Sequence, residues 1–498
     1  ARDLSPEEPV LILSGNGIDH ALMSLAGMAV GVPTCPMSTA YSTVSQDLGK
    51  LTYALDLLTP RLVFASDGRT FGRALRKVKE RGIEICVSDD TADELGATRF
   101  SSLLDRPISS AVVSARSEVG PDTIAKFLFT SGSTKAPKGV VNTHRMICAN
   151  QQQVRQCMAF LAEEPPVLID WLPWNHTFGG NHNVGITLYN GGTLYIDDGK
   201  PTPKGIAQTL ANLREIAPTV YFNVPKGFEE IAAAMDTDTV LRDSLFTRCK
   251  AFMFAGAGLS QAVWDKLDAH GEAAVGERLR MVTGLGMTET APACMFAVGT
   301  DTRTGHIGLP VPGVEVKLVK DASTGGKLEI RFKGPNVMPG YWRAPEQTAD
   351  AFDDEGFYRT GDAGRLIDPD DIQQGVFFDG RTAEDFKLST GTFVNVGPLR
   401  MKIVLAGDPL VQDAVITGLN RDDVGALLFP RPDECRKLAG AADDGPVGAS
   451  RDSRAACPAR VTARWRRRHP AGPSGTVCSS PARDASRRRA SRVRHTSP

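Results

Sequence analysis

The chain has 498 residues, a formal net charge of −1, 41% hydrophobic residues and 7% aromatic residues. This length is enough for roughly two to four domains with a sizeable core, which excludes a small disulfide-stapled scaffold. The nine cysteines include no CxxC pair, which argues against a structural zinc site and favours a reducing compartment. The longest nearly apolar stretch, residues 21–32, is too short to span a bilayer. No charged-then-apolar leader opens the sequence, so we expect a cytoplasmic protein without a membrane partner.

The near-neutral charge conceals a basic C-terminal stretch. Residues 441–498 contain thirteen arginines, no lysine and four acids, a formal charge of +9, so residues 1–440 carry −10. The stretch also lacks Leu, Ile, Phe and Met, and it cannot bury enough apolar surface to offset the entropy of ordering. We therefore expect residues 441–498 to be disordered. A basic arm for nucleic acid is the alternative, but Trp465 is its only aromatic residue, so no nucleic-acid partner is expected. A shifted reading frame is a further hypothesis for this composition.

Residues 9–438 have the pattern of an α/β protein, in which short β-rich runs alternate with helical segments. In chain order, the expected strands are 10–13, 62–65, 84–87, 126–130, 219–222 and 250–254. The expected helices are 51–58, 70–81 and 147–161. After residue 308, strands at 314–318, 327–332 and 375–378 predict a β subdomain, and one more strand is expected at 414–418. We therefore expect a large domain over 1–380, a hinge and incomplete small α+β domain over 381–440, and a tail over 441–498.

The most distinctive local feature is the run FLFTSGSTKAPKGV at residues 127–140. An apolar strand leads into small residues, which let backbone N–H groups approach an anion, and into hydroxyls and lysines, which add donors and charge. This composition predicts a polyphosphate site, with an ordinary polar turn as the alternative. The run is not a Walker loop, because the G-x4-G-K-[ST] register is missing, and glycine pairs elsewhere lack the third glycine of a dinucleotide fingerprint.

Five motifs in chain order resemble those of the adenylate-forming superfamily of acyl- and aryl-CoA synthetases, luciferases and peptide-synthetase adenylation domains. They are the run at 130–140, FAGAG at 254–258, TGLGMTE at 283–289, YRTGD at 358–362 and GR at 380–381. The resemblance implies an α/β fold with a large N-terminal domain of parallel-type sheets, and it implies ATP, Mg²⁺ and CoA as cofactor and co-substrates. It assigns ATP or AMP binding to Thr130, Ser131, Gly132, Ser133, Thr134, Lys138, Gly256, Ala257, Gly258, Thr283, Gly284, Gly286, Asp362 and Arg381.

The resemblance also assigns catalytic roles and a hinge. It places catalysis at Thr288, Glu289 and Lys387, with Glu289 as the magnesium ligand, and the hinge at Glu384 and Asp385. Glu289 offers hard oxygen atoms suited to Mg²⁺, although a lone glutamate at a helix start would be an ordinary surface residue. The carboxylate at position 362 can accept two ribose hydroxyls, and the guanidinium at position 381 is a permanent cation with a planar fork for oxygen atoms.

The segment WLPWNHTFGG at residues 171–180 points to the pocket for the acid substrate. In the superfamily, a histidine or aromatic residue at the position of His176 borders the carboxylate; a core histidine is the alternative. Flat apolar surface for an aromatic acid is expected from Trp171, Trp174, Phe178 and Tyr221. Plain core packing explains the same four residues equally well. Asn181 and His182 follow, but no third ligand is in sight, so no metal site is expected there.

Three stretches resemble feruloyl-CoA synthetases within the superfamily. They are GRTAEDFKLSTG at 380–391, the lysine at position 135 of the phosphate run, and residues 9–51. This resemblance implies activation of a hydroxycinnamate such as ferulate. The acid would attack the α-phosphate of ATP to give an acyl-adenylate, and the CoA thiol would then displace AMP after the small domain rotates about the hinge.

The C-terminal part departs from the superfamily pattern. Its members normally end in a small domain, on the order of a hundred residues, that brings a lysine to the active site for adenylation. Here the family-like sequence stops near residue 440, and Lys437 is the last lysine. Arginine does not freely replace a lysine point charge, so we expect weakened adenylation. Two alternatives stay open: an acyl-adenylating enzyme that uses a carrier protein, and a non-catalytic nucleotide-binding remnant.

Overall fold

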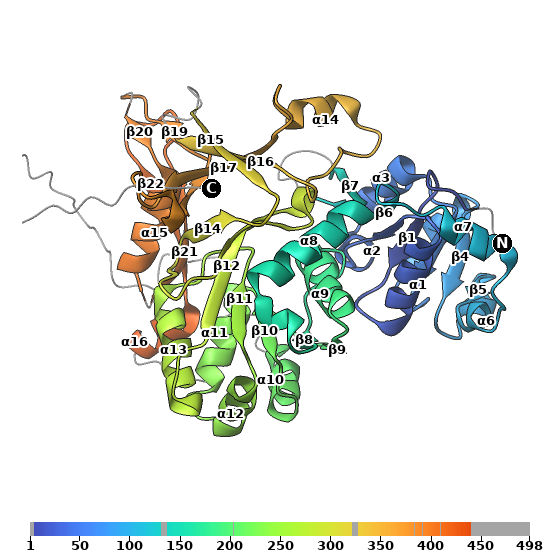
Figure 1. The fold of residues 1–498 in the computed structure, drawn as a ribbon, viewed down its shortest axis with the longest axis horizontal. Coiled ribbons are helices and arrows are strands. Elements are labelled where there is room, and N and C mark those ends of the chain that lie inside the picture. Colours follow the sequence, from blue (N-terminus) through green and yellow to red (C-terminus); the bar gives the residue numbers. More distant parts are fainter. Residues whose placement is uncertain are drawn as a thin grey trace, which may run out of the picture. The chain divides into compact units, whose positions relative to one another are not determined.

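The protein is described here from a computed structural model. The structure describes residues 4–130, 137–202, 204–320, 327–382, 384–390, 392–408 and 410–439. Residues up to Cys435 form one compact unit, drawn in Figure 1. The basic stretch at 441–498 lies outside the described residues, so its expected disorder stays a prediction, as does the domain boundary at residue 380. In the described part of the chain, no helix is both long and apolar enough to cross a bilayer.

The first sheet has seven strands in the order β5-β4-β3-β1-β2-β6-β7. Its strands are β1 (Val10–Leu13), β2 (Thr34–Pro36), β3 (Leu62–Ala65), β4 (Glu84–Val87), β5 (Thr98–Arg99), β6 (Ile124–Phe129) and β7 (Gly139–Thr143). All neighbours are parallel except β6 and β7, which form an antiparallel hairpin. Alternate residues of β1 enter two separate apolar clusters. The sheet is therefore covered on both faces, which explains why its strands are continuous apolar runs.

The second sheet has nine strands in the order β10-β11-β12-β13-β14-β18-β17-β16-β15. They are β10 (Val220–Asn223), β11 (Ala251–Phe254), β12 (Arg280–Gly286), β13 (Ala293–Ala297), β14 (His306–Pro310), β15 (Glu315–Lys320), β16 (Leu328–Lys333), β17 (Tyr358–Leu366) and β18 (Val376–Arg381). Strands β10 to β12 are parallel and the remaining pairs are antiparallel. The expected β subdomain is thus hydrogen-bonded to the parallel strands as one continuous sheet.

Helices cover both sheets, and smaller pairs of strands complete the fold. The α-helices are α1 (Ile18–Ala29), α2 (Ala40–Thr43), α3 (Gly49–Leu58), α4 (Gly72–Glu80), α5 (Ala92–Leu95), α6 (Ser101–Leu104), α7 (Ser110–Ser117), α8 (His144–Cys157), α9 (Val184–Tyr189), α10 (Ile206–Glu215), α11 (Pro225–Ala234), α12 (Thr239–Thr247), α13 (Gln261–Val275), α14 (Pro345–Ala351), α15 (Val396–Ala406) and α16 (Pro432–Ala439). The paired strands are β8 (Val167–Asp170) with β9 (Thr193–Ile196), β19 (Phe386–Lys387) with β20 (Phe393–Val394), and β21 (Val411–Thr417) with β22 (Gly425–Pro430). These elements confirm the expected α/β class.

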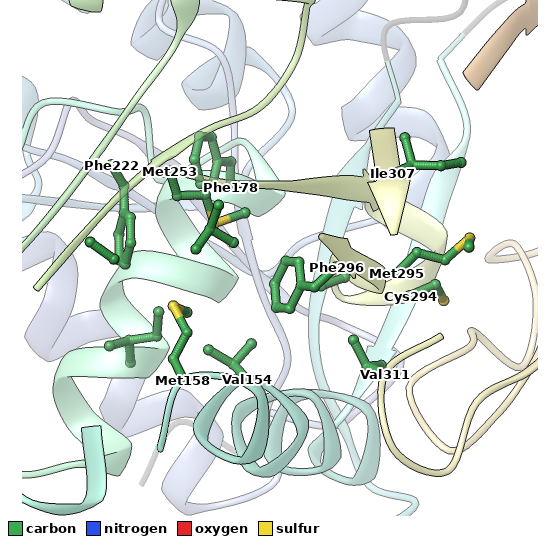
Figure 2. Close-up of a cluster of buried hydrophobic side chains, with 14 of the residues drawn as sticks. Val154, Met158, Phe178, Phe222, Met253, Cys294, Met295, Phe296, Ile307 and Val311 are labelled. Atoms are coloured by element: carbon green, nitrogen blue, oxygen red, sulfur yellow. The ribbon is translucent and has the colours of Figure 1, made fainter. Parts of the chain in front are cut away.

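The core around β10–β12 lies on two faces of the sheet. Helices α10–α13 gather on one side of these strands (Figure 1), where Phe252 packs among their apolar residues. On the other face, Met253 and Phe222 pack against Val154 of α8 and Met158, which follows that helix; Figure 2 shows this cluster. The alternation along each strand therefore sends one set of side chains toward α10–α13 and the other toward α8.

Candidate functional site

The phosphate run forms the turn of the β6–β7 hairpin. The Thr130 amide donates to the Lys138 carbonyl at 3.1 Å, and the Thr130 hydroxyl accepts from the Lys138 amide at 3.4 Å, so these two residues close the turn. Four predicted phosphate-binding residues lie outside the described residues: Ser131, Gly132, Ser133 and Thr134. The middle of the apolar run of β6 is buried, and both of its end residues are half-buried.

Glu289 lies next to this hairpin. Strand β7 bridges to Tyr341, whose hydroxyl donates to Glu289 Oε1 at 3.0 Å. Lys138 Nζ lies 4.3 Å from the centre of the same tyrosine ring. The Glu289 backbone is fixed as well, because its carbonyl accepts from the Met338 amide at 2.8 Å. Three parts of the chain therefore meet at the Glu289 carboxylate: the hairpin, the turn after β12 and residues 338–341. Tyr341, which donates the hydrogen bond to this carboxylate, was not identified from the sequence.

The Glu289 carboxylate is buried and lacks a cation in direct contact among the described residues. Burial raises its pKa, while hydrogen bonds from the hydroxyls of Tyr341 and Tyr358 and the charge of Lys138 oppose that rise. In the described part of the chain, no group of three His, Cys, Asp or Glu side chains could hold a metal. Mg²⁺ bound through one carboxylate and substrate phosphates needs no such group, so the residues fit the predicted ion.

Asp362 lies on β17 opposite Arg381 of β18. The guanidinium Nε is 3.5 Å from Asp362 Oδ1, and the arginine side chain is exposed while the aspartate is buried. Burial raises the pKa of Asp362 to about 6; Arg381 opposes this, and the charges of Glu384, Glu289 and Glu329 add to it. Because Glu289 acts on Asp362 electrostatically and bonds to Tyr358 of the same strand, the two predicted carboxylates border one site.

The predicted glycines divide into two kinds. Gly256 has φ +87° and Gly258 follows it in the exposed loop after β11, and a Cβ at either position would meet nothing within 4 Å. In contrast, a Cβ at Gly284 would lie 2.1 Å from the Met295 carbonyl oxygen, and one at Gly286 would lie 2.1 Å from the Pro292 carbonyl oxygen. The first pair is open to a ligand, whereas the second pair permits close pairing of β12 with β13.

The remaining residues of these two motifs flank the glycines. Ala257 is exposed between its glycines, Thr283 is buried within β12, and Thr288 is half-buried in the turn that follows β12. Since β11 and β12 are adjacent and parallel, the loops after them share one edge of the sheet. Ligands of open α/β sheets bind at this carboxyl edge.

His176 and Tyr221 differ in their surroundings. His176 is exposed, yet the surrounding protein lowers its pKa by desolvation. Its Nδ1 accepts a hydrogen bond from the Phe178 amide at 3.3 Å. Tyr221 is buried on the helix side of β10, where its ring contacts Phe228 and Phe252. Core packing therefore accounts for Tyr221, and its neighbour Phe222 is the residue that faces away from the helices.

A π-helical segment (Phe178–Asn183) follows His176 and lies against the phosphate hairpin. Lys126 Nζ on β6 donates to the Gly180 carbonyl at 3.2 Å, and Asn181 Nδ2 donates to Asn142 Oδ1 on β7 at 2.8 Å. Between β8 and the end of this segment, six buried side chains have a polar atom without a hydrogen-bond partner: Asp170, Trp171, Trp174, Asn181, His182 and Asn183. π-helical turns and unsatisfied buried polar groups both mark functional sites.

His182 is the deepest of these side chains. Burial lowers its pKa to about 4, so the ring is neutral at pH 7. Its Nδ1 lies 2.8 Å from Asn183 Oδ1, while Nε2 has no partner. The ring packs with Phe178, Phe222 and Phe296 at centroid distances of 5.4, 5.2 and 6.4 Å; Figure 2 shows these three phenylalanines in one cluster. From the sequence, His182 was considered only as a possible metal ligand, which was not expected, and its unpaired Nε2 was not anticipated.

The predicted hinge residues are not equivalent. Asp385 Oδ2 lies 2.6 Å from Lys327 Nζ, with both side chains buried, and Asp385 Oδ1 accepts from the Val396 amide at 2.8 Å. Glu384 is exposed, and so is Lys387 on β19. The structure thus ties position 385 to the β16–β18 region and brings neither Glu384 nor Lys387 into contact with Glu289.

Comparisons with known proteins identify the family and the fold. A family model described as "AMP-binding enzyme" matches residues 1–342. The chain is 27% identical over 465 residues to "Long-chain-fatty-acid--CoA ligase 1" of Cavia porcellus, covering 82% of this chain and 63% of that protein. It is 26% identical over 347 residues to "Probable CoA ligase CCL8" of Humulus lupulus, covering 64% of this chain and 53% of that protein. The matched region therefore spans roughly half to two thirds of these curated relatives.

The fold is shared with solved structures. A benzoate CoA ligase from Burkholderia xenovorans LB400 matches with a TM-score of 0.68 at 22% identity, covering 86% of this chain and 80% of that one. At this identity the likeness concerns the fold, while the family model covers more than two thirds of the sequence. The chain belongs to the family of AMP-binding enzymes.

Proposed function

We propose that the chain activates a carboxylic acid with ATP, forming an acyl-adenylate and pyrophosphate, and then transfers the acyl group to CoA. The observation that carries this proposal is the meeting of Lys138, Glu289 and Asp362 around one site. A cation next to a phosphate-type hairpin, a buried carboxylate and a carboxylate beside an arginine are the groups that a magnesium nucleotide requires.

In this proposal, each residue acts on a different part of the nucleotide. Asp362 accepts hydrogen bonds from the ribose hydroxyls, and Arg381 keeps that carboxylate ionised. Lys138 and the hairpin amides contact the phosphates. Glu289 holds Mg²⁺, which when bound neutralises phosphate charge as pyrophosphate leaves. Tyr341 keeps Glu289 in position through its hydroxyl, so the protein supplies orientation and charge rather than a nucleophile.

The acid is proposed to lie between the π-helical segment and the phosphate hairpin. Lys126 and Asn142 fasten this segment to β6 and β7, so a carboxylate beside His176 is close to the hairpin that would hold the α-phosphate. In the second half-reaction the CoA thiolate attacks the acyl carbonyl and AMP leaves with the bonding electron pair. We expect Asp385 to be the pivot for the rotation that admits CoA.

A phenolic acid such as a hydroxycinnamate is the proposed substrate class. Asn183 Oδ1 lies 2.8 Å from His182 Nδ1, and an amide oxygen can only accept a hydrogen bond. The Nδ1 atom then carries the proton, and Nε2 is left as an acceptor among aromatic rings. An aromatic acid with a hydroxyl donor satisfies Nε2, whereas cinnamate leaves it unpaired at a cost of about 1–3 kcal/mol.

Substrate discrimination tests this assignment. We expect kcat/KM for CoA-thioester formation to be about 5- to 150-fold higher with 4-hydroxycinnamate than with cinnamate, the range that corresponds to 1–3 kcal/mol. The variant His182→Phe removes the acceptor and is expected to abolish the preference, while Phe178→Leu keeps the acceptor and serves as the matched control. An unchanged preference in His182→Phe would show that another residue or a buried water satisfies Nε2.

The adenylation step is tested separately. For a protein made of these 498 residues, pyrophosphate release with ferulate and MgATP is expected to be slow, because residues 438–498 contain no lysine to act as the C-terminal lysine of the family does. Thioester formation from supplied feruloyl-adenylate is expected to proceed. A normal rate of pyrophosphate release would show that this lysine is dispensable. Replacing free CoA by an acyl-carrier protein in the same assay distinguishes a carrier-dependent enzyme, and nucleotide binding without turnover would indicate a binding protein.

A further inference from the structure

The turn that carries Glu289 has a sterically disfavoured backbone. This turn joins β12 to β13 and contains Ala291, a buried residue with φ +63°. A residue other than glycine is disfavoured in this left-handed region and keeps the conformation only where the surrounding contacts impose it. Contacts that impose it at Ala291 therefore also bear on the carboxylate two residues earlier.

Two asparagines hold the backbone of this turn from the protein interior. Asn336 Nδ2 donates to the Thr290 carbonyl at 2.8 Å and to the Ala293 carbonyl at 2.9 Å. Asn150 on α8 donates to the same Ala293 carbonyl at 2.8 Å, and its Oδ1 accepts from the Ala293 amide at 3.3 Å. Both asparagines are fully buried. They therefore fix the backbone on both sides of Ala291.

Gln153 joins the two asparagines into one network. It lies almost one turn beyond Asn150 on α8, and its Oε1 accepts from Asn150 Nδ2 at 3.0 Å. Its Nε2 donates to Asn336 Oδ1 at 3.3 Å and to the Pro312 carbonyl at 3.0 Å. Because the glutamine is buried as well, breaking one of these bonds leaves a buried polar group unpaired, so the three amides support one another.

The network reaches the segment that also holds the Glu289 side chain. Asn336 lies two residues before Met338, whose amide donates to the Glu289 carbonyl at 2.8 Å. Three residues further on, the Tyr341 hydroxyl donates to Glu289 Oε1 at 3.0 Å. One short segment therefore holds the turn through Asn336 and the carboxylate through Tyr341.

We propose that Asn150, Gln153 and Asn336 are positioning residues that hold the Glu289 carboxylate where it receives Mg²⁺. Among the described residues, no hydrogen bond joins any of the three side chains to this carboxylate, so they act on it through the backbone of the turn. The part of this inference that concerns the metal rests on the proposed function, whereas the part that concerns the position of the carboxylate does not.

Magnesium binding tests the part that concerns the metal. Calorimetric titration with ATP over a range of Mg²⁺ concentrations is expected to show about 10-fold weaker Mg²⁺ binding in Asn150→Ala and in Asn336→Ala, because residues that support a metal ligand contribute to metal affinity. The affinity for AMP without metal is expected to stay unchanged. Gln153→Met is the milder variant, since it leaves both asparagines bonded to the turn, and we expect a smaller loss.

The matched control is Gln151→Ala. Gln151 is next to Asn150 on α8 and is similarly buried, but it donates to the Asn181 carbonyl at 2.9 Å, away from the Glu289 turn. We expect its Mg²⁺ affinity to equal that of the wild type. Unchanged Mg²⁺ affinity in all three network variants, or an equal loss in the control, would overturn the proposal.

Urea unfolding tests the position of the carboxylate without metal or nucleotide. Tyr341→Phe is expected to lower the urea midpoint, because it removes a hydrogen bond to Glu289. This shift is expected to be smaller in the Asn336→Ala background, where the carboxylate is no longer held at the hydroxyl, and unchanged in the Gln151→Ala background. Equal shifts in all backgrounds would overturn the proposal. If the wild type bound ATP equally well with and without Mg²⁺, the proposed function would fail, and the unfolding comparison would still decide whether the network positions Glu289.

Discussion

Lys126 is a buried amine whose charge has little compensation. It lies on β6 with its Nζ donating to the Gly180 carbonyl, and no carboxylate of the described residues forms an ion pair with it. Burial lowers its pKa from 10.5 to about 8. We predict that Lys126→Met removes a pH-dependent part of the stability, because methionine fills similar space without an ionisable group.

The magnitude follows from the two pKa values. The fall in the pKa from 10.5 to about 8 means that ionising the amine is less favourable in the folded state than in the unfolded state by roughly 3 kcal/mol. Below pH 8 the amine is charged in both the folded and the unfolded state, so the folded state is destabilised by the full free energy of burying the charge. Between pH 8 and 10.5 the unfolded chain binds a proton that the folded chain does not, so the free energy of unfolding rises with pH.

The measurement is urea unfolding of the wild type and Lys126→Met at pH 7, 8, 9 and 10. Other groups titrate alike in both proteins, so the difference in unfolding free energy isolates this amine. We expect the wild type to gain about 2–3 kcal/mol on the variant between pH 8 and 10. The exposed Lys200→Met is the control, since it removes the same charge without a buried amine. A difference that is constant with pH would refute the reasoning.

Three further predictions concern the candidate site. Gly284→Ala is expected to lower the free energy of unfolding by about 1–3 kcal/mol in urea unfolding, because its Cβ would lie 2.1 Å from the Met295 carbonyl oxygen. AMP affinity is expected to fall between pH 7 and 5, because burial raises the pKa of Asp362 to about 6 and its protonated form accepts fewer hydroxyl bonds; calorimetric titration measures it. Tyr341→Phe removes a hydrogen bond to Glu289 and is expected to weaken MgATP binding about 3- to 10-fold in the same titration.

Each of these has an outcome that contradicts it. A Gly284→Ala protein as stable as the wild type would mean that β12 and β13 can separate without cost. In Asp362→Asn the pH dependence of AMP affinity should disappear; if it persists, another group titrates. If Tyr341→Phe binds MgATP and AMP with the same affinities as the wild type, Glu289 does not bind the metal.

The strands β1, β3 and β4 were predicted with the bounds that the structure has. Strands β1 and β3 are four-residue apolar runs that are fully buried, and β4 has three buried apolar residues after a half-buried Glu84, so a single local signal specifies each strand. The helix expected over 147–161 was placed too far along the chain, because α8 runs from His144 to Cys157. Its end was missed because Met158 adopts φ −119° and ψ 71° without a glycine or proline to signal the stop. Strand β12, which contains TGLG, was not predicted, since its glycines are explained only by the neighbouring strand.

The candidate site was predictable where one motif carries one role. Glu289 and Asp362 were expected to border a common site, and the structure brings them within electrostatic range. Tyr341 and the unpaired Nε2 of His182 were missed because each depends on contacts with residues far away in the sequence. Tyr341 contacts Glu289, and the His182 ring packs with Phe222 and Phe296. Aromatic composition suggested Tyr221 for the acid pocket, yet the alternation along β10 places it on the helix side.

The continuity of the nine-stranded sheet has a mechanical consequence. Strand β17 is four strand spacings from β12, about 19 Å on a flat sheet, yet the hydroxyl of Tyr358 on β17 reaches Glu289, which lies three residues beyond the end of β12. The sheet must therefore coil, as the irregular register at Gly308 and elsewhere along its ladder allows. Curvature thus bears on the distance between the Glu289 and Asp362 carboxylates, so a substitution that flattened the bend at Gly308 would be expected to move these two groups apart without replacing either of them.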